Sequence, residues 1–254
     1  KKIITQQEVS ESMERVIAGP ERKGRVLDEQ TKHIIAYHES GHALVGHILE
    51  HSDPVHKISI VSRGQALGYT LQLPQEDHFL KTKNEMLDEL AVFLGGRVAE
   101  ELMCDDITSG ASNDLERATK MAREMVTRLG MSEELGTQVF GEAQHQVFLG
   151  RDYGHTKGYG ENVASKIDSE VKRIVDECYD KAKAIILDHR DVLDAAAALL
   201  LEKEKISRDE FEALFEKENV DAYYLEFDDE RSGGFEPLEH VNGDKKVVLG
   251  LITT

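Results

Sequence analysis

The sequence predicts a mainly α-helical fold with a small β element. Three stretches repeat apolar residues every three or four positions, at residues 84–103, 113–129 and 161–187. A short region after Pro54 alternates apolar and polar residues instead, which indicates strands. The chain has 254 residues, of which 40% are hydrophobic and 31% charged, a composition typical of globular domains that bury a sizeable core.

Two helices are expected before Pro54. Apolar spacing predicts a short helix over residues 6–18, and the Gly19-Pro20 pair ends it. A second helix has an apolar stretch from Ile34 to Leu49, and Asp28 is its expected N-cap. Proline disfavours helical geometry in the residue before it, so this second helix is expected to end before Pro54.

The region after Pro54 changes to a period of two, the period of a half-buried strand. The turn between the two alternating runs is expected at residues 63–65, which read Arg-Gly-Gln. This arrangement predicts a β-hairpin. Its alternating residues are Ile58, Ile60, Tyr69, Leu71 and Leu73.

The second half of the chain predicts more helices and one long loop. Residues 136–160 contain six glycines without a sustained period, which is typical of a surface loop. Residues 161–187 form the longest amphipathic pattern, and residues 191–217 predict a helical pair around residues 206–208. Residues 218–254 are acidic and irregular, so a flexible tail is expected there.

Charge and cysteine content exclude several classes of function. The formal net charge is −18, which argues against a surface for nucleic acid or anionic membrane. No run approaches the ~18 apolar residues that a membrane span needs. Cys104 and Cys178 are isolated, so neither a disulfide scaffold nor a cysteine-rich zinc site is expected, which favours a reducing compartment.

The strongest local signal is the pentapeptide His-Glu-Ser-Gly-His at residues 38–42, inside the second predicted helix. Side chains four residues apart share a helix face, with Cβ atoms about 5–6 Å apart, so His38 and His42 can bind one metal ion. Glu39 lies about 100° further round the helix, where its carboxylate can accept a proton from a metal-activated water. The pattern is typical of zinc hydrolases. The ordinary alternative is a pair of hydrogen-bonded core histidines.

A competing pair lies nearby, because residues 47–51 read His-Ile-Leu-Glu-His, the inverted zinc motif. On a helical wheel His47 and His51 fall about 180° and 220° from His38. The apolar residues of the helix lie within about 80° of His38. We therefore expect the first pair to face the interior, and His47 and His51 to face solvent. The apolar residues are Ile34, Ile35, Val45, Ile48 and Leu49.

A catalytic zinc ion needs a third protein ligand, and two carboxylates compete for that position. Glu101 lies in helical register with Leu94 and Val98, and Asp114 opens the next helix in register with Ala118. Glu101 is equally compatible with a buried salt bridge, and Asp114 with a first-turn residue favoured by the helix dipole. Spacing alone leaves both candidates open.

Four segments together resemble the peptidase domain of the FtsH family, membrane-anchored AAA proteases that depend on ATP and zinc. In order they read AYHESGHAL (36–44), RGQALG (63–68), LGGRVAEE (94–101) and TSGASND (108–114), within roughly residues 3 to 216. The pentapeptide alone would also fit unrelated zincins, but four motifs in order make the resemblance specific. Ser40 replaces a more usual alanine and Ser62 a more usual proline, and neither touches the chemistry.

The resemblance implies a helical, zincin-like peptidase domain with one Zn²⁺ per chain. It implies His38, His42 and Asp114 as the metal ligands and Glu39 as the general base. Glu100 and Glu101 then become candidates for holding the ligands in place.

The resemblance also implies an edge strand beside the metal, with Leu67, Gly68 and Tyr69 as substrate-strand candidates. An extended polypeptide would add to this strand through backbone hydrogen bonds, with weak side-chain specificity. An ordinary structural hairpin is an equal alternative for these residues.

By the same resemblance, residues 1–20 match the last helix of a preceding ATPase module and residues 21–217 the zinc peptidase domain. No G-x-x-x-x-G-K-[ST] motif occurs, so ATP and Mg²⁺ are expected to act only through a module outside this chain. We expect the protease part of a longer, membrane-anchored polypeptide that assembles as a homo-hexamer and degrades unfolded or misassembled proteins. The expected location is the cytoplasmic side of a bacterial inner membrane, or its organellar equivalent, with membrane contact only through segments outside this chain.

Two other classes of function remain as alternatives. One is a non-catalytic helical assembly or adaptor module with a structural zinc ion or none, which a closed four-ligand site would favour. The other is a zinc hydrolase acting on small molecules, which the pentapeptide allows but the resemblance disfavours.

Overall fold

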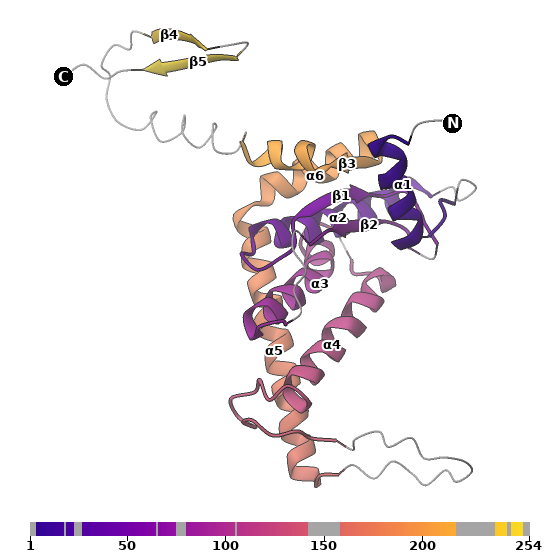
Figure 1. Cartoon of the computed structure of the whole chain (residues 1–254), viewed down its shortest axis with the longest axis vertical. Helices are drawn as coiled ribbons and strands as arrows, with labels where there is room; N and C mark the ends of the chain where they lie inside the picture. The colour runs from indigo at the N-terminus through magenta and orange to yellow at the C-terminus, as the bar shows by residue number, and fades with distance from the viewer. Residues whose placement is uncertain are drawn as a thin grey trace, which may run out of the picture. The chain divides into compact units, whose positions relative to one another are not determined.

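The computed structural model describes residues 4–17, 19–22, 27–64, 66–74, 80–104, 106–141, 158–216, 237–242 and 245–250. The chain forms two compact units, Lys1–Phe215 and Glu216–Thr254. The first unit is mainly helical with one small antiparallel sheet, which confirms the predicted fold class (Figure 1). No helix among the described residues is long and apolar enough to cross a bilayer.

Helix α3 lies at the centre of the first unit, where it packs against α2, α4 and α5 (Figure 1). Helix α2 also packs against α6 and the sheet. A 3-10 turn, Ser109–Ala111, leads directly into α4, and residues 208–216 are also helical. The α-helices are α1 (Gln6–Ile17), α2 (Glu29–Ile48), α3 (Lys83–Met103), α4 (Ser112–Thr127), α5 (Glu161–Asp188) and α6 (Arg190–Lys203).

Side-chain caps fix where the two central helices begin. Asp28 is the N-cap of α2, as predicted, and its carboxylate accepts a hydrogen bond from the Thr31 backbone N–H at 2.8 Å. Thr82 caps α3 in a capping box with Glu85, so backbone donors at the helix start are satisfied in both directions. These caps fix the first turns of α2 and α3, which pack against each other.

The small sheet has the strand order β2-β1-β3, with both pairs antiparallel. Its strands are β1 (Val55–Ser59), β2 (Tyr69–Gln72) and β3 (Lys205–Ser207). The predicted hairpin is therefore present, and β2 is an edge strand of this sheet. The helical pair predicted around residues 206–208 is present as α6 and the helix at residues 208–216, but the residues that join them form strand β3, in which Ile206 pairs with Ile58 of β1. A strand of three residues is too short to give a periodic signal.

Helices α2 and α3 cross at glycines. A Cβ at Gly41 would lie 2.5 Å from the Gly95 carbonyl oxygen and 2.6 Å from the Ala99 Cβ. Real Cβ atoms do not approach backbone this closely, so the absence of a side chain at this position permits the contact. The crossing brings the residues of the pentapeptide directly against α3.

Two hydrophobic clusters meet on α2, so this helix is buried on most sides. Leu44 belongs to the cluster with α3, α4 and α5, and Ile35 to the cluster with the sheet and α6. The prediction of one inward face is consequently too simple: Ser40, on the expected polar side, is fully buried, whereas Ile48, on the expected apolar side, is 38% exposed. A sequence wheel assumes one core, and here there are two.

The second unit contains a two-stranded antiparallel hairpin of β4 (Pro237–Asn242) and β5 (Lys245–Gly250). The acidic composition of residues 218–254 predicts no regular structure. The twelve residues of β4 and β5 differ from that prediction, because they form strands. The run Val247-Val248-Leu249 is the strand signal that the composition obscured. Of the loop predicted over residues 136–160, residues 142–157 lie outside the described part of the chain, and its described ends contain no helix or strand.

Candidate metal centre

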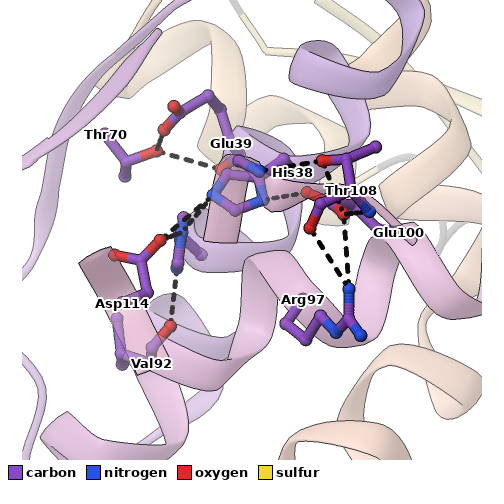
Figure 2. Close-up of polar contacts among 10 residues, drawn as sticks. His38, Glu39, Thr70, Val92, Arg97, Glu100, Thr108 and Asp114 are labelled. Atoms are coloured by element: carbon purple, nitrogen blue, oxygen red, sulfur yellow. Dashed lines mark hydrogen bonds and ion pairs between the residues drawn. The ribbon is translucent and has the colours of Figure 1, made fainter. Parts of the chain in front are cut away.

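Three side chains from two helices converge on one point. His38 and His42, one turn apart on α2, place their Nε2 atoms 3.0 Å from each other. Asp114, in the first turn of α4, places its Oδ2 atom 3.4 Å from His38 Nε2 and 3.7 Å from His42 Nε2 (Figure 2). Among the residues that the structure describes, these three form the only group of His, Cys, Asp or Glu side chains close enough together to hold a metal ion.

Hydrogen bonds at the opposite ring nitrogens orient both imidazoles. His38 Nδ1 donates to Glu100 Oε1 at 2.8 Å, and His42 Nδ1 donates to the Val92 carbonyl oxygen at 2.7 Å (Figure 2). A carboxylate and a carbonyl only accept, so each Nδ1 carries the hydrogen and each neutral ring keeps its lone pair on Nε2. Two lone pairs 3.0 Å apart repel unless a proton or cation lies between them. Two imidazole nitrogens and one carboxylate oxygen are a donor set that fits zinc.

Glu100 supports His38 from α3. Its side chain is 1% exposed and also accepts hydrogen bonds from Thr108, from the backbone N–H at 2.9 Å and from the hydroxyl at 3.1 Å. Burial would raise the pKa of Glu100, but the hydrogen bonds from His38 and Thr108 hold it below its usual value. An ionised carboxylate at this position fixes the ring orientation of a metal-binding histidine.

Glu101, the neighbouring candidate, lies outside this cluster. Its carboxylate accepts hydrogen bonds from Lys183, at 2.8 Å, and from Tyr179, both on α5. Val92 and Glu100 therefore lie on the face of α3 that packs against α2. Glu101 contacts α5, although it shares helical register with Leu94 and Val98. Because α3 is buried on several sides, its apolar residues do not single out the face of the site.

The charges within the cluster are strongly coupled. Burial would lower the pKa of His38, but its hydrogen bonds to Asp114 and Glu100 outweigh burial and raise the pKa to about 10. Burial would raise the pKa of Asp114, yet hydrogen bonds from His38 and His42 hold it far below its usual range. Metal binding at these atoms must therefore displace a proton, which makes metal affinity dependent on pH.

Glu39 is buried beside the two imidazoles, with 7% of the residue exposed. The Thr70 hydroxyl lies 2.9 Å from Glu39 Oε2 and 3.0 Å from the Glu39 carbonyl oxygen (Figure 2). Burial raises the pKa of Glu39, although the neighbouring His38 and His42 act in the opposite direction. A carboxylate with a raised pKa is better able to hold a proton near neutral pH.

Glycines on both sides of the cluster leave room for its side chains. A Cβ at Gly96 would lie 2.5 Å from His42 Nε2 and 2.6 Å from His38 Cε1. A Cβ at Gly68, just before β2, would lie 2.8 Å from Glu39 Oε1. A side chain at either position would occupy space that the site requires.

The three substrate-strand candidates have different surroundings. Gly68 lies against Glu39, whereas the Tyr69 hydroxyl donates to Glu14 of α1 at 2.9 Å. Leu67 is half-buried, and its carbonyl oxygen accepts a hydrogen bond from the Ser62 hydroxyl at 3.3 Å. The structure thus places Gly68 beside the pentapeptide and attaches Tyr69 to α1.

The second histidine pair takes no part in the cluster. His47 is half-buried and stacks on Phe215, with ring centroids 4.3 Å apart, so the prediction that it faces solvent is wrong. His51 is exposed, as predicted. The aromatic partner of His47 lies more than 160 residues away in sequence, and helix spacing cannot reveal such a contact.

Four further contributors to the site went unrecognised in the sequence. Thr70 and Gly68 lie two residues apart, the spacing that places strand residues on one face, and this was the available signal for Thr70. Gly96 precedes Glu100 by one helical turn, which likewise indicates a shared face. Nothing in the sequence identifies the Val92 carbonyl or the Thr108 hydroxyl as partners, because both contacts depend on tertiary packing.

Comparison with known proteins gives a consistent family match. The sequence model described as peptidase family M41 matches residues 25–214. The chain is 60% identical over 211 residues to a protein of Slackia heliotrinireducens named ATP-dependent zinc metalloprotease FtsH, covering 83% of this chain and 27% of that protein. It is 53% identical to FtsH 1 of Conexibacter woesei and 52% identical to FtsH of Thermotoga maritima, covering 84% and 85% of this chain. The chain spans only 33% and 35% of these two relatives.

Proposed function

Because this chain belongs to peptidase family M41, we propose that it is a zinc-dependent endopeptidase that cleaves unfolded polypeptide. The observation that carries the proposal is the convergence of His38 Nε2, His42 Nε2 and Asp114 Oδ2 beside the buried carboxylate of Glu39. The relatives' shared name, zinc metalloprotease, supports the same chemistry.

The ligand set we propose is His38, His42 and Asp114, with Glu100 holding His38 in orientation. A zinc ion bound there would supply Lewis acidity to the reacting water and to the substrate carbonyl. Glu100 stays ionised through its hydrogen bonds from His38 and Thr108, and it fixes the tautomer in which His38 Nε2 is free to coordinate.

Glu39 is the general base in this proposal. Its carboxylate takes the proton from the attacking water and returns it to the amine nitrogen when the peptide bond breaks. Burial raises the pKa of Glu39 and so lets it hold this proton between the two transfers. Thr70 restricts the position of the carboxylate through its hydrogen bond, and Gly68 provides the space that the carboxylate occupies.

Strand β2 is the proposed docking site for substrate. It is an edge strand in the sheet order β2-β1-β3, and Gly68 and Thr70 contact Glu39. An extended polypeptide that pairs with this edge would have its backbone next to the base. Leu67, Gly68 and Tyr69 are the residues we assign to this strand contact.

The setting we propose is a homo-hexamer next to a membrane, on the cytoplasmic side of a bacterial inner membrane or its organellar equivalent. ATP-driven unfolding would come from a module outside this chain. Two facts support this setting: the relatives are named ATP-dependent, and the chain covers 27% to 35% of their length. The membrane contact would lie outside this chain as well.

Replacing Glu39 by glutamine tests the catalytic role. Glu39→Gln keeps the shape of the side chain but removes the base, so we expect casein cleavage to fall by at least about a hundredfold while one zinc ion per chain remains bound. Glu50→Gln, at an exposed position just after α2, is the matched control and should retain full activity. Normal turnover by the Glu39 variant would refute the assigned base.

A zinc-loaded wild-type chain without any peptidase activity would refute the proposed function itself. That outcome would favour the alternative of an adaptor module with a structural metal ion.

A further inference from the structure

Helix α1 is attached to the sheet through a buried carboxylate. The Glu14 side chain is only 2% exposed. It accepts hydrogen bonds from Lys57 Nζ at 2.6 Å, from Arg63 at 3.1 Å and from the Tyr69 hydroxyl at 2.9 Å. Burial would raise the pKa of Glu14, but Lys57, Tyr69 and Arg63 together hold it below its usual value, so this carboxylate is ionised near neutral pH.

Apolar packing contributes little to this attachment. Val16 and Ile17 of α1 are 86% and 59% exposed, and Val9 and Met13 are each more than 40% exposed. A buried ion pair is a poor source of stability compared with apolar contact, but it fixes geometry because its partners must stay in place. The contacts of Glu14 therefore define where α1 lies on the sheet.

The segment after α1 is joined to the connection between β1 and β2. The Arg22 backbone N–H donates to the Ser62 carbonyl oxygen at 3.0 Å, and the Gly64 N–H donates to the Pro20 carbonyl oxygen at 3.1 Å. Arg63 also donates to the Gly19 carbonyl oxygen at 3.4 Å. The compact unit accordingly includes both α1 and the helices and strands that follow it.

Strand β2 connects this attachment to the candidate base. Tyr69 contacts Glu14, whereas its neighbours Gly68 and Thr70 contact Glu39. Alternate residues of a strand point to opposite faces, so the two contacts are made on opposite sides of the same three residues. A displacement of Tyr69 must therefore also move the groups that restrain the Glu39 carboxylate.

Resting on the proposed function, we propose that Glu14 is a positioning residue for catalysis. Through Tyr69 it holds β2 in the place where Thr70 donates a hydrogen bond to Glu39 and Gly68 leaves room for the Glu39 carboxylate. A shift of α1 relative to the sheet thereby changes the peptidase rate without a change in the metal ligands. Residues 1–20 thus act as part of the peptidase machinery.

The test uses the full chain and the variants Glu14→Gln, Tyr69→Phe and their double variant. Glu11→Gln, at an exposed position on the same helix, is the matched control. For each zinc-loaded protein, kcat and KM are measured with an unstructured fluorogenic peptide, together with zinc content and melting temperature. Hydrogen exchange at the amides of residues 69–72 reports the order of β2 independently of activity.

We expect each single variant to lower kcat by about ten- to a hundredfold, the scale of loss when a catalytic group is slightly misplaced. KM should rise by a smaller factor than kcat falls, because loosening β2, the proposed docking strand, weakens substrate binding, whereas misplacing Glu39 acts on the transition state. Zinc should remain at one ion per chain, and exchange in β2 should accelerate. The combined loss in the double variant should be smaller than the product of the two single losses, because the Glu14–Tyr69 contact that Tyr69→Phe removes is also weakened by Glu14→Gln. Glu11→Gln should match wild type in every measurement.

Several results would overturn the inference. One is a variant whose kcat per zinc-loaded molecule equals that of the wild type. Another is a loss of activity that lower zinc content or a lower folded fraction explains completely. The third is a double variant whose loss is the full product of the two single losses. Tyr69→Phe removes only a hydroxyl, so it gives an answer even if Glu14→Gln does not fold. If the wild-type chain is itself inactive, the proposed function fails, and unchanged exchange in β2 of the Glu14 variant would then refute the positioning role separately.

Discussion

Asp114 joins the histidines of α2 from a different helix, and it decides whether the cluster is a complete metal site. We expect Asp114→Ala to lose zinc, because two imidazoles alone leave the ion without its third protein ligand. Glu101→Ala is the matched control and should retain zinc, since Glu101 pairs with Lys183 on α5. Metal analysis of the purified variants measures both outcomes. A zinc-free Glu101 variant beside a zinc-loaded Asp114 variant would reverse the assignment.

At the level of single residues, the sequence identified side chains whose relation is local. His38, Glu39 and His42 lie within one helical turn, so helix geometry alone predicts that the histidines share a face. The choice between Glu101 and Asp114 needed the family resemblance, because both lie in register with apolar residues. Only the packing distinguishes the role of Glu100 from that of Glu101, because Glu100 is the one on the face of α3 toward α2.

At the level of elements, the contact between α2 and α3 limits the size of the side chains that α3 can have where it faces α2. We expect Gly96→Ala to reduce zinc affinity by at least about tenfold, because the added methyl group would lie 2.5 Å from the coordinating nitrogen of His42. Gly160→Ala, where a Cβ meets nothing within 4 Å, is the control and should bind zinc normally. Competition with a zinc-binding dye measures both affinities. Equal affinity in the two variants would contradict the steric argument.

The packing of α2 against the helix at residues 208–216 makes stability depend on pH through His47. Burial lowers the pKa of His47, chiefly by disfavouring its charged form beside Phe211 and Phe215. The unfolded chain therefore binds this proton more readily, and the free energy of unfolding decreases as pH falls below the ordinary histidine pKa of about 6.5. The loss stops once pH falls below the lowered pKa of the folded state.

His47→Gln should remove this contribution. Between pH 7.5 and 5.5 we expect the free energy of unfolding of the variant to fall less than that of the wild type, as measured by urea denaturation. His51→Gln, at an exposed position of the same segment, should behave as wild type. A parallel decrease in all three proteins would show that His47 has no role in the pH dependence.

Elements were predictable where they are long and repeat one pattern. The helices at residues 84–103, 113–129 and 161–187 have close counterparts in α3, α4 and α5. Strand β3 was not predictable, because it has three residues and exists through its pairing with β1. The hairpin of β4 and β5 was hidden because an acidic composition outweighed the one short run of β-forming residues, at residues 247–249.

For the whole molecule, exposed apolar side chains are consistent with assembly. Ile107, Leu115 and Leu129, near or on α4, are 48%, 39% and 50% exposed. In the proposed ring we expect native mass spectrometry of the zinc-loaded chain to give six chains with six zinc ions. The Asp114→Ala variant is the control for metal stoichiometry. A monomer at tens of micromolar concentration would refute the ring for this chain.

The arrangement of whole segments was the least predictable level. The resemblance matches residues 1–20 to the last helix of an ATPase module, and in the folded chain α1 belongs to the compact unit Lys1–Phe215. The residues that attach α1 are 43 to 55 positions away from Glu14, so only the folded chain reveals their contact.

The position of β2 at the edge of its sheet has a consequence for selectivity. An edge strand presents main-chain N–H and C=O groups, which are the same in every polypeptide. A native protein has already committed nearly all its own amides to internal partners, so it has few to offer. Whether a protein is degraded would then depend on whether its backbone amides are free to pair with β2. Any process that unfolds a protein would therefore make it a substrate.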